Sequence, residues 1–311
     1  MPHQQTDHSR YRHLALATFY LSILSLASID VERSGTLLFA QEVSPGSVAD
    51  PQTNTTALFQ EGLARKGTGD LRGAIEIFHR VVALRPAHAE THYQLALALE
   101  EAHDLDGAIK EYETLTALAP GHVDGQFRAG LAYSRQNEYA KAIQAFSAVL
   151  RVDPDHKDAR FNIGLAFRKT GDQEWAKRQF ERVLKQDPRH PGAHTSLGNM
   201  AYEQGNLLQA ISEYRAALAG DPQHIGARRN LAAVLKQQGN LSEAIAEYRE
   251  VIRRRNTDPT LHIEYADTLL ANKQPTEAAK AYQQALTLLP LTSDQSELRA
   301  RIENQLKQLK P

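Results

Sequence analysis

Histidine is the reactive residue type with the most regular spacing in this sequence. Five of the thirteen histidines recur every 34 residues: His88, His122, His156, His190 and His224. If the period reflects stacked helices, successive members lie about 8 to 10 Å apart. A zinc to histidine bond is about 2 Å long, so they cannot share a metal. The row then fits two interpretations: turn residues that tolerate unusual backbone angles and hydrogen-bond to a helix start, or a set that gains charge together as the pH falls below about 6.5.

Sequence patterns typical of catalysis are missing. The chain has no Gly-rich phosphate loop, HExxH, GxSxG or paired catalytic carboxylates on a signature. It also has no cysteine, which excludes disulfides, thiolate catalysis, cysteine-based zinc or iron-sulfur sites and lipid attachment through cysteine. We therefore expect no catalytic, cofactor-binding or metal-binding residues, and a protein that is not an enzyme.

The histidine period belongs to a repeat that fills most of the chain. The stretch GDLRGAIEIFHRVVALRP, residues 69–86, returns 34 residues later as HDLDGAIKEYETLTALAP, residues 103–120. In every repeat position 8 is Gly or Ala, position 20 is Ala and position 24 is aromatic, and proline closes six of the seven copies. The seven repeats, numbered 1 to 7, are residues 55–88, 89–122, 123–156, 157–190, 191–224, 225–258 and 259–292.

Each repeat predicts two helices that cross closely. A first helix of about 13 residues is followed by a turn rich in Gly, Asn and Asp, and a second helix stops before the proline. The alanine four residues before the ring lies on the same helical face, so a neighbouring helix can approach while the ring fills the space beside it. No single pair can bury its own apolar face, which explains why the unit is repeated.

This pattern resembles the tetratricopeptide repeat family over about three quarters of the chain. The resemblance implies one elongated all-α domain, a right-handed superhelical solenoid of antiparallel helix pairs. Residues 293–311 are predicted to form a capping helix, because Leu298, Ile302, Leu306 and Leu309 make one apolar stripe. Two departures from the pattern are expected to be local packing variants: Asn256 in repeat 6, and Gln173, Trp175 and Lys177 in repeat 4.

The resemblance also implies a concave groove, lined by the first helices, in which ligands bind. In repeats 1 to 4 this row is an aromatic residue followed by leucine, and later it becomes polar with positive charge. Alternatively, the aromatic rings pack mainly against the adjacent repeat. Some family members hold a peptide carboxylate with lysine and asparagine in the groove; the polar residues here offer similar chemistry, but that clamp is incomplete. The candidate ligand-binding residues are Phe59, Leu63, Tyr93, Leu97, Phe127, Leu131, Phe161, Asn162, Leu165, Arg168, Asn199, Tyr202, Arg229, Asn230 and Lys236.

The first 54 residues differ from the repeats. Residues 1–40 are interpreted as a signal peptide or N-terminal anchor and residues 41–54 as a linker. The uncharged run LALATFYLSILSLASI, residues 14–29, is shorter than the about 20 residues of a membrane-spanning helix and suits a secretory signal, with cleavage after Ala27 or Ala40. We expect export, periplasmic or secreted, or alternatively a membrane anchor.

Composition narrows the classes of partner. The net charge is -1, with 36 Lys and Arg against 37 Asp and Glu, which argues against nucleic acid. Membrane contact is expected only through an uncleaved N-terminal segment. We therefore expect a non-enzymatic scaffold that binds a peptide or protein segment in the concave groove. The alternatives are an accessory protein that binds glycan or cell-wall polymer, and a regulatory subunit of a separately encoded enzyme.

Overall fold

The computed structural model describes residues 51–290, 292 and 295–309. This part of the chain contains helices and turns and no strand. The predicted signal or anchor, residues 1–40, lies outside it, and α1 already includes the last four residues of the predicted linker, 51–54. The helices are α1 Pro51–Gly67, α2 Leu71–Leu84, α3 Ala89–Glu101, α4 Leu105–Leu118, α5 Val123–Arg135, α6 Tyr139–Val152, α7 Lys157–Thr170, α8 Gln173–Gln186, α9 Pro191–Glu203, α10 Leu207–Gly220, α11 Ile225–Gln237, α12 Leu241–Arg254, α13 Pro259–Ala271, α14 Pro275–Leu288 and α15 Ser296–Gln308.

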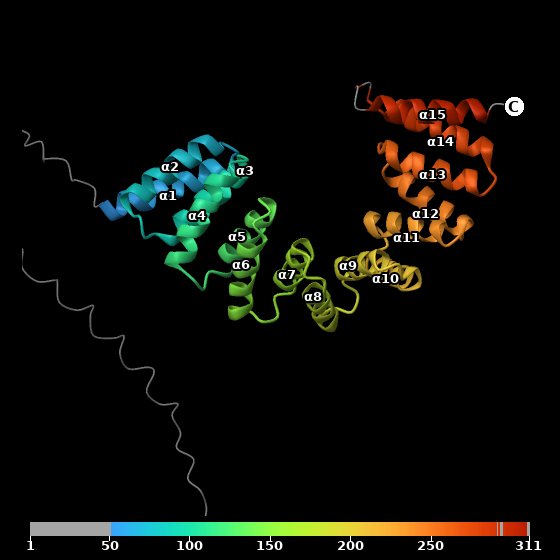
Figure 1. Ribbon diagram of the computed structural model, residues 1–311. Helices are drawn as coiled ribbons and strands as arrows, with labels where there is room; N and C mark the ends of the chain where they lie inside the picture. Colours follow the sequence, from blue (N-terminus) through green and yellow to red (C-terminus); the bar gives the residue numbers. More distant parts are fainter. Residues whose placement is uncertain (1–50, 291, 293–294, 310–311) are drawn as a thin grey trace, which may run out of the picture. The chain divides into compact units, whose positions relative to one another are not determined.

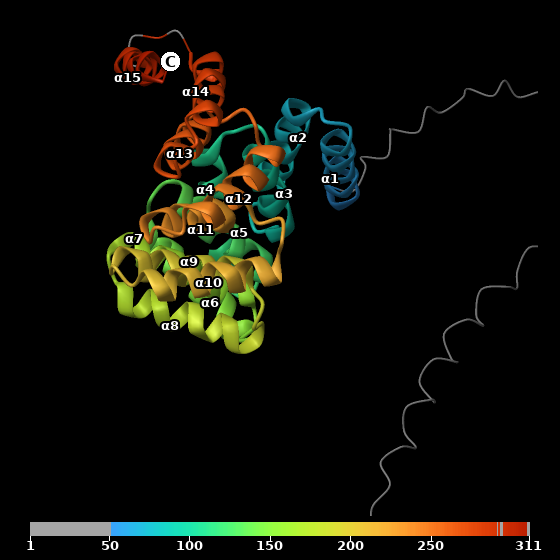
Figure 2. The same ribbon diagram turned by 90° about the vertical axis from the view of Figure 1, so that its right-hand side faces the viewer.

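The helices are stacked in chain order, each against the next (Figures 1 and 2). The two helices of one repeat make the most extensive contacts, and the second helix then packs on the first helix of the next repeat. First helices of consecutive repeats also touch, for example α9 and α11, whereas second helices make no comparable contact within the described residues. The predicted all-α solenoid of helix pairs is confirmed, and the first helices line its inner side.

The turn inside each repeat is fixed by one residue with a left-handed backbone. Position 15 is glycine in four repeats, with φ between 76° and 90°, and a non-glycine residue in three, with φ between 59° and 64°. The next residue starts the second helix; Asp70 and Asp104, for example, accept hydrogen bonds from the backbone N–H groups of Gly73 and Gly107. The left-handed residues are Gly69, His103, Asn137, Gly171, Gly205, Gly239 and Lys273.

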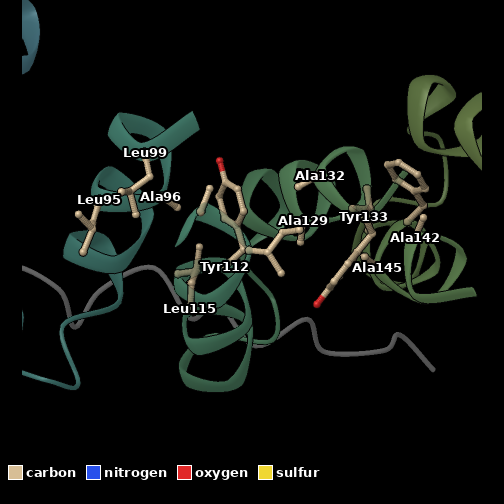
Figure 3. Close-up of a cluster of buried hydrophobic side chains, with 14 of the residues drawn as sticks. Leu95, Ala96, Leu99, Tyr112, Leu115, Ala129, Ala132, Tyr133, Ala142 and Ala145 are labelled. Carbon is tan, nitrogen blue, oxygen red and sulfur yellow. The ribbon is translucent and has the colours of Figure 1, made fainter. Parts of the chain in front are cut away.

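The core consists of the close helix crossings that the sequence predicts. A Cβ atom added to Gly164 would lie 2.6 Å from the Phe180 ring, so the residue at position 8 must be small. The alanines at position 20 are fully buried and the rings at position 24 are at most 2% exposed. Figure 3 shows the Tyr112 ring between Ala96 of α3 and Ala129 of α5, so one ring seals the junction between two repeats.

The last helix closes the stack. α15 packs on α14, and Ile302 is 1% exposed. Leu298, Leu306 and Leu309 pack against the same apolar cluster. The predicted apolar stripe therefore covers the end of repeat 7, as a capping helix must.

Candidate ligand-binding face

All fifteen candidate residues lie on the first helices, on the inner side of the stack. Fourteen of them are half-buried, and Tyr202 of α9 is 43% exposed. The face therefore consists of side chains that contact neighbouring repeats while keeping part of their surface open to solvent. Its two halves differ in how these contacts are made.

In repeats 1 to 4 the aromatic residue at position 5 packs against the histidine at position 34. The ring centroids lie 4.8 to 5.5 Å apart. In repeats 1, 3 and 4 the same ring also approaches the aromatic residue at position 24, at 5.6 to 5.9 Å. Both partners belong to the same repeat as the ring, and the histidine is also the N-cap of the next repeat's first helix, so one side of each ring faces that junction. The four pairs are Phe59 with His88, Tyr93 with His122, Phe127 with His156, and Phe161 with His190.

The histidines of this row are helix N-caps. In four of them Nδ1 accepts the backbone N–H three residues later, at 2.9 to 3.2 Å, whereas Nδ1 of His88 contacts the Thr91 hydroxyl at 2.6 Å. The predicted hydrogen bond to a helix start is thus confirmed. The predicted unusual backbone angles are wrong: φ is between -62° and -83°, which is ordinary for a cap. The nitrogen that accepts the helix N–H does so through its lone pair, so Nδ1 acts as the cap in these four rings.

In repeat 6 the same two positions hold an ion pair. Arg229 replaces the aromatic ring and Asp258 replaces the histidine, with 3.1 Å between Nη1 and Oδ2. Arg229 also binds Glu264 of α13 through two hydrogen bonds of 2.9 and 2.7 Å. The hydrogen bonding that Arg229 donates to Glu264 is the main reason why the pKa of Arg229 is raised. Arg229 already has carboxylate partners within the chain.

The other candidate cations, in repeats 4 and 6, are also paired. Arg168 lies 3.1 Å from Glu203, and Lys236 lies 4.0 Å from Asp267, which also pairs with Arg301. Each of these cations has a carboxylate partner, so the positive charge that the sequence predicted for this face is neutralised. A ligand carboxylate would have to displace one of these partners.

Three candidate residues come together at a pocket between α9 and α11. Asn199 Oδ1 accepts hydrogen bonds from Tyr214 Oη and Asn230 Nδ2, both of 2.8 Å. Burial raises the pKa of Tyr214 to about 12, which keeps its hydroxyl protonated as a donor. The pocket has a volume of about 210 Å³ and a half-exposed aromatic rim, Tyr202. It is lined by Asn199, Tyr202, Glu203, Tyr214, Asn230, Ala233 and Val234.

The pocket exists because the leucine of the row is lost. Position 9 is leucine in repeats 1 to 4, but Asn199 in repeat 5 and Ala233 in repeat 6. The shorter side chain of Ala233 leaves a hollow, and Asn199 gives it a polar floor. Within the described residues, Asn199 Nδ2 and Asn230 Oδ1 have no hydrogen-bond partner, so the floor offers one donor and one acceptor to a ligand.

The sequence-based prediction missed the carboxylates of this face. Asp258, Glu264 and Asp267 hold the cations that were expected to hold a ligand. One signal was present: histidine at position 34 changes to Asp258 in the same repeat in which the aromatic residue changes to Arg229. No such signal exists in the sequence for the pocket residues Glu203, Ala233 and Val234. They come from two different helices, and they form a pocket only because α9 and α11 lie side by side.

The part of the chain that the structure describes has neither a cluster of metal-binding side chains nor a membrane-spanning helix. No three His, Asp or Glu side chains gather closely enough to hold a metal ion. No helix there is both long and apolar enough to cross a membrane.

Comparison with protein families identifies the repeat. Two models described as tetratricopeptide repeat match the chain, one at residues 127–176, 174–225 and 195–259, the other at residues 67–132 and 235–302. Together they cover more than half of the chain. The protein belongs to the tetratricopeptide repeat family.

Solved structures share the fold at low sequence identity. A tetratricopeptide repeat protein from Parabacteroides merdae is 17% identical, with a TM-score of 0.61 over 83% of this chain and 99% of that chain. Pseudomonas aeruginosa PilF is 18% identical, with a TM-score of 0.55 over 70% and 97%. A chain of the APC/C hetero-tetramer Cut9–Hcn1 is 16% identical, with a TM-score of 0.59 over 87% and 50%. No curated protein matches the sequence.

Proposed function

We propose that this protein is a non-enzymatic scaffold that binds a segment of another protein along the inner face of its first helices. The observation that carries the proposal is the pocket between α9 and α11, with its aromatic rim and its open donor and acceptor. A peptide backbone presents one acceptor and one donor per residue, which suits such a floor. A related fold occurs in the Cut9–Hcn1 hetero-tetramer, a complex of two proteins, which supports a protein partner.

The proposed contact differs from a carboxylate clamp. Arg229 and Lys236 form ion pairs with Glu264 and Asp267. We therefore expect them to define the shape of the binding face and not to attract a ligand carboxylate. The uncharged polar atoms and Tyr202 remain available to a ligand. Affinity is therefore expected to depend weakly on salt.

Filling the pocket tests the proposal. Ala233→Leu restores the leucine of repeats 1 to 4 and closes the hollow, while Ala219→Leu adds the same side chain at an exposed position of α10. Proteins captured by the wild type would be identified by mass spectrometry, purified, and titrated against each variant. We expect Ala233→Leu to weaken binding at least tenfold and Ala219→Leu to leave it unchanged.

The other outcomes separate the alternatives. Equal binding by both variants would move the site away from the pocket. Retention of saccharide in place of protein would favour the glycan-binding reading. An enzyme activity that co-purifies with the chain would favour a regulatory subunit.

We also propose that the protein is exported, with an uncleaved membrane anchor as the alternative. The support is the apolar run at residues 14–29 and the small residues Ala27 and Ala40. N-terminal sequencing of the protein from its native cell would decide this. A mature chain that starts at Ser28 or Gln41 supports export, and an intact N-terminus in the membrane fraction supports the anchor.

A further inference from the structure

The outer surface of repeat 4 carries an exposed tryptophan, the single one in the chain. Trp175 of α8 was expected to be a local packing variant, but it is 51% exposed. Its ring is stacked against Phe167 of α7, with centroids 6.0 Å apart, and the Arg178 guanidinium lies 5.2 Å from its centroid. The tryptophan therefore forms a platform that supports an arginine at the surface, since a guanidinium stacks well on an aromatic face.

Three cations extend this platform along α8. Arg178, Arg182 and Lys185 follow Trp175 at intervals of three, four and three residues, which places all four side chains on one helical face. All three cations are exposed. No other second helix has cations at all three of these repeat positions.

These cations lack carboxylate partners within the described residues. None of the three, nor Lys177 beside them, forms an ion pair, whereas the candidate cations on the inner face are all paired. The carboxylates of α8 are Glu174 and Glu181, and neither reaches a cation within ion-pair distance in the described part of the chain. The helix therefore presents an excess of positive charge.

We propose that this face of α8, formed by Trp175, Arg178, Arg182 and Lys185, docks a helix of a partner protein that carries carboxylates one turn apart. Arg178 and Arg182 are four residues apart, so their side chains lie about 6 Å apart on the helix surface, which is also the spacing of glutamates at four-residue intervals. A guanidinium binds a carboxylate through two parallel hydrogen bonds. The stacked ring holds Arg178 in place, which reduces the entropy lost on binding.

A protein helix fits this surface better than a lipid bilayer does. At a membrane interface tryptophan inserts its ring among the headgroups, but the ring of Trp175 already contacts Phe167 and Arg178. The apolar side chains of α8, such as Phe180 and Val183, are buried in the repeat and cannot enter a membrane. The surface is also separate from the pocket between α9 and α11, so this proposal does not depend on the proposed function.

The test uses a defined probe and the full chain. The probe is a fluorescein-labelled, alanine-based helical peptide with glutamate at every fourth position, and its control is the same peptide with glutamine. Binding is followed by fluorescence anisotropy at low and high salt, and independently by the emission of Trp175, which reports on this surface alone because the chain has no other tryptophan.

Two double variants give matched comparisons. Arg178→Gln with Arg182→Gln removes the two neighbouring guanidiniums of α8. Arg72→Gln with Arg80→Gln removes two exposed arginines of α2 that form no ion pair within the described residues. Arg80 occupies the repeat position of Arg182. Glutamine keeps a high helix propensity, so all variants are expected to fold, and circular dichroism checks this.

We expect the glutamate peptide to bind and to change the emission of Trp175, and the glutamine peptide to bind at least tenfold more weakly. The Arg178 and Arg182 double variant should lose about tenfold in affinity at low salt, since each exposed pair contributes modestly, and the α2 variant should bind like the wild type. The Ala233→Leu variant should also bind normally. The proposal is overturned if both peptides bind equally or not at all, if the α8 variant retains full affinity, or if phosphatidylserine vesicles bind while the peptide does not.

Discussion

Repeats 1 to 4 and repeat 6 use different side chains at the junction with the next repeat, that is, at positions 5 and 34. In the first group an aromatic ring at position 5 packs on a histidine that caps the next helix. In repeat 6 the two positions hold Arg229 and Asp258, which form an ion pair while Asp258 caps the next helix. Both pairs occupy the same two repeat positions, so the same joint between helices can be made by a ring pair or by an ion pair.

The two chemistries differ in strength and in what weakens them. Aromatic pairs contribute about 0.5 to 1.5 kcal/mol beyond the area they bury, whereas an ion pair at this exposure contributes about 1 kcal/mol or less and is screened by salt. Ring junctions should therefore be stronger and insensitive to salt. Four changes, from the largest expected effect to the smallest, test this difference.

Removal of a ring should have the largest effect. Phe127→Ala or Phe161→Ala should lower the free energy of unfolding by about 2 kcal/mol, less than for a fully buried phenylalanine because both rings are half-buried. At the same repeat position, Thr195→Ala should cost about 0.5 kcal/mol or less. Urea unfolding followed by circular dichroism measures both. Equal losses would mean that the rings contribute nothing that a threonine does not.

The turn at position 15 provides a baseline, because both halves share it. Gly69→Ala in repeat 1 and Gly239→Ala in repeat 6 should each cost about 1 kcal/mol, the usual cost of a left-handed residue with a Cβ atom. A Cβ atom meets nothing within 4 Å at either site, so only the backbone conformation matters. Thermal melts should show the same shift for both. Lys273→Gly should raise stability by a similar amount, and unequal shifts at Gly69 and Gly239 would mean that the halves differ beyond their junctions.

Salt should distinguish the ion pair from the ring pair. A double-mutant cycle of Arg229→Met and Glu264→Gln should give a coupling of about 1 kcal/mol at low salt that shrinks as salt is added. The corresponding cycle of Phe127→Leu and His156→Asn should depend little on salt, because it measures a contact between two rings and not an ion pair. A coupling in the first cycle that persists at high salt would show that hydrogen-bond geometry outweighs charge there.

Acid should weaken a ring junction by the smallest amount. Burial is the main cause that lowers the pKa of His190, despite the opposing effect of Asp187. The stability contributed by the neutral ring is therefore complete above the unfolded pKa of about 6.5 and is lost as the pH falls through the lower folded pKa. Between about pH 7.5 and about pH 5 the wild type should lose more stability than His190→Asn. The difference should be at most about 1 kcal/mol, the usual contribution of an N-cap. Parallel pH profiles would mean that the ring does not titrate in this range.

Much of the fold could be predicted because one rule recurs seven times. The small residue at position 8 and the ring at position 24 give the register of each helix crossing, and Gly164 with Phe180 shows why the pairing is obligatory. The contacts between repeats were harder to predict. Asp258 pairs with Arg229, and Asn199 with Asn230, although the partners are about 30 positions apart in the sequence. The residue types at one repeat position do not show which side chains contact the next repeat.

Trp175 shows a second limit of pattern reading. A large apolar residue at an irregular position predicts a packing variant, because most tryptophans are largely buried. Whether it faces inward depends on the turn of α8 about its axis, which is fixed by Ala176 and Phe180. Because Ala176 and Phe180 face the core, the helical period places position 175 on the outer side of α8. The exposure of Trp175 could therefore have been predicted from its position, although not from its residue type.

Four of the five capping histidines connect two repeats, since each starts the first helix of one repeat and packs on a ring from the first helix of the repeat before it. The chain can therefore be shortened or lengthened by whole units of 34 residues. Deletion of residues 157–190 would place His156 directly before Pro191, where His190 stood, with Phe127 in the place of Phe161. The new joint would have the same donor, acceptor and stacked ring as the old one. Such interchangeable joints allow an ancestral gene to gain or lose copies by recombination and still encode a folded protein.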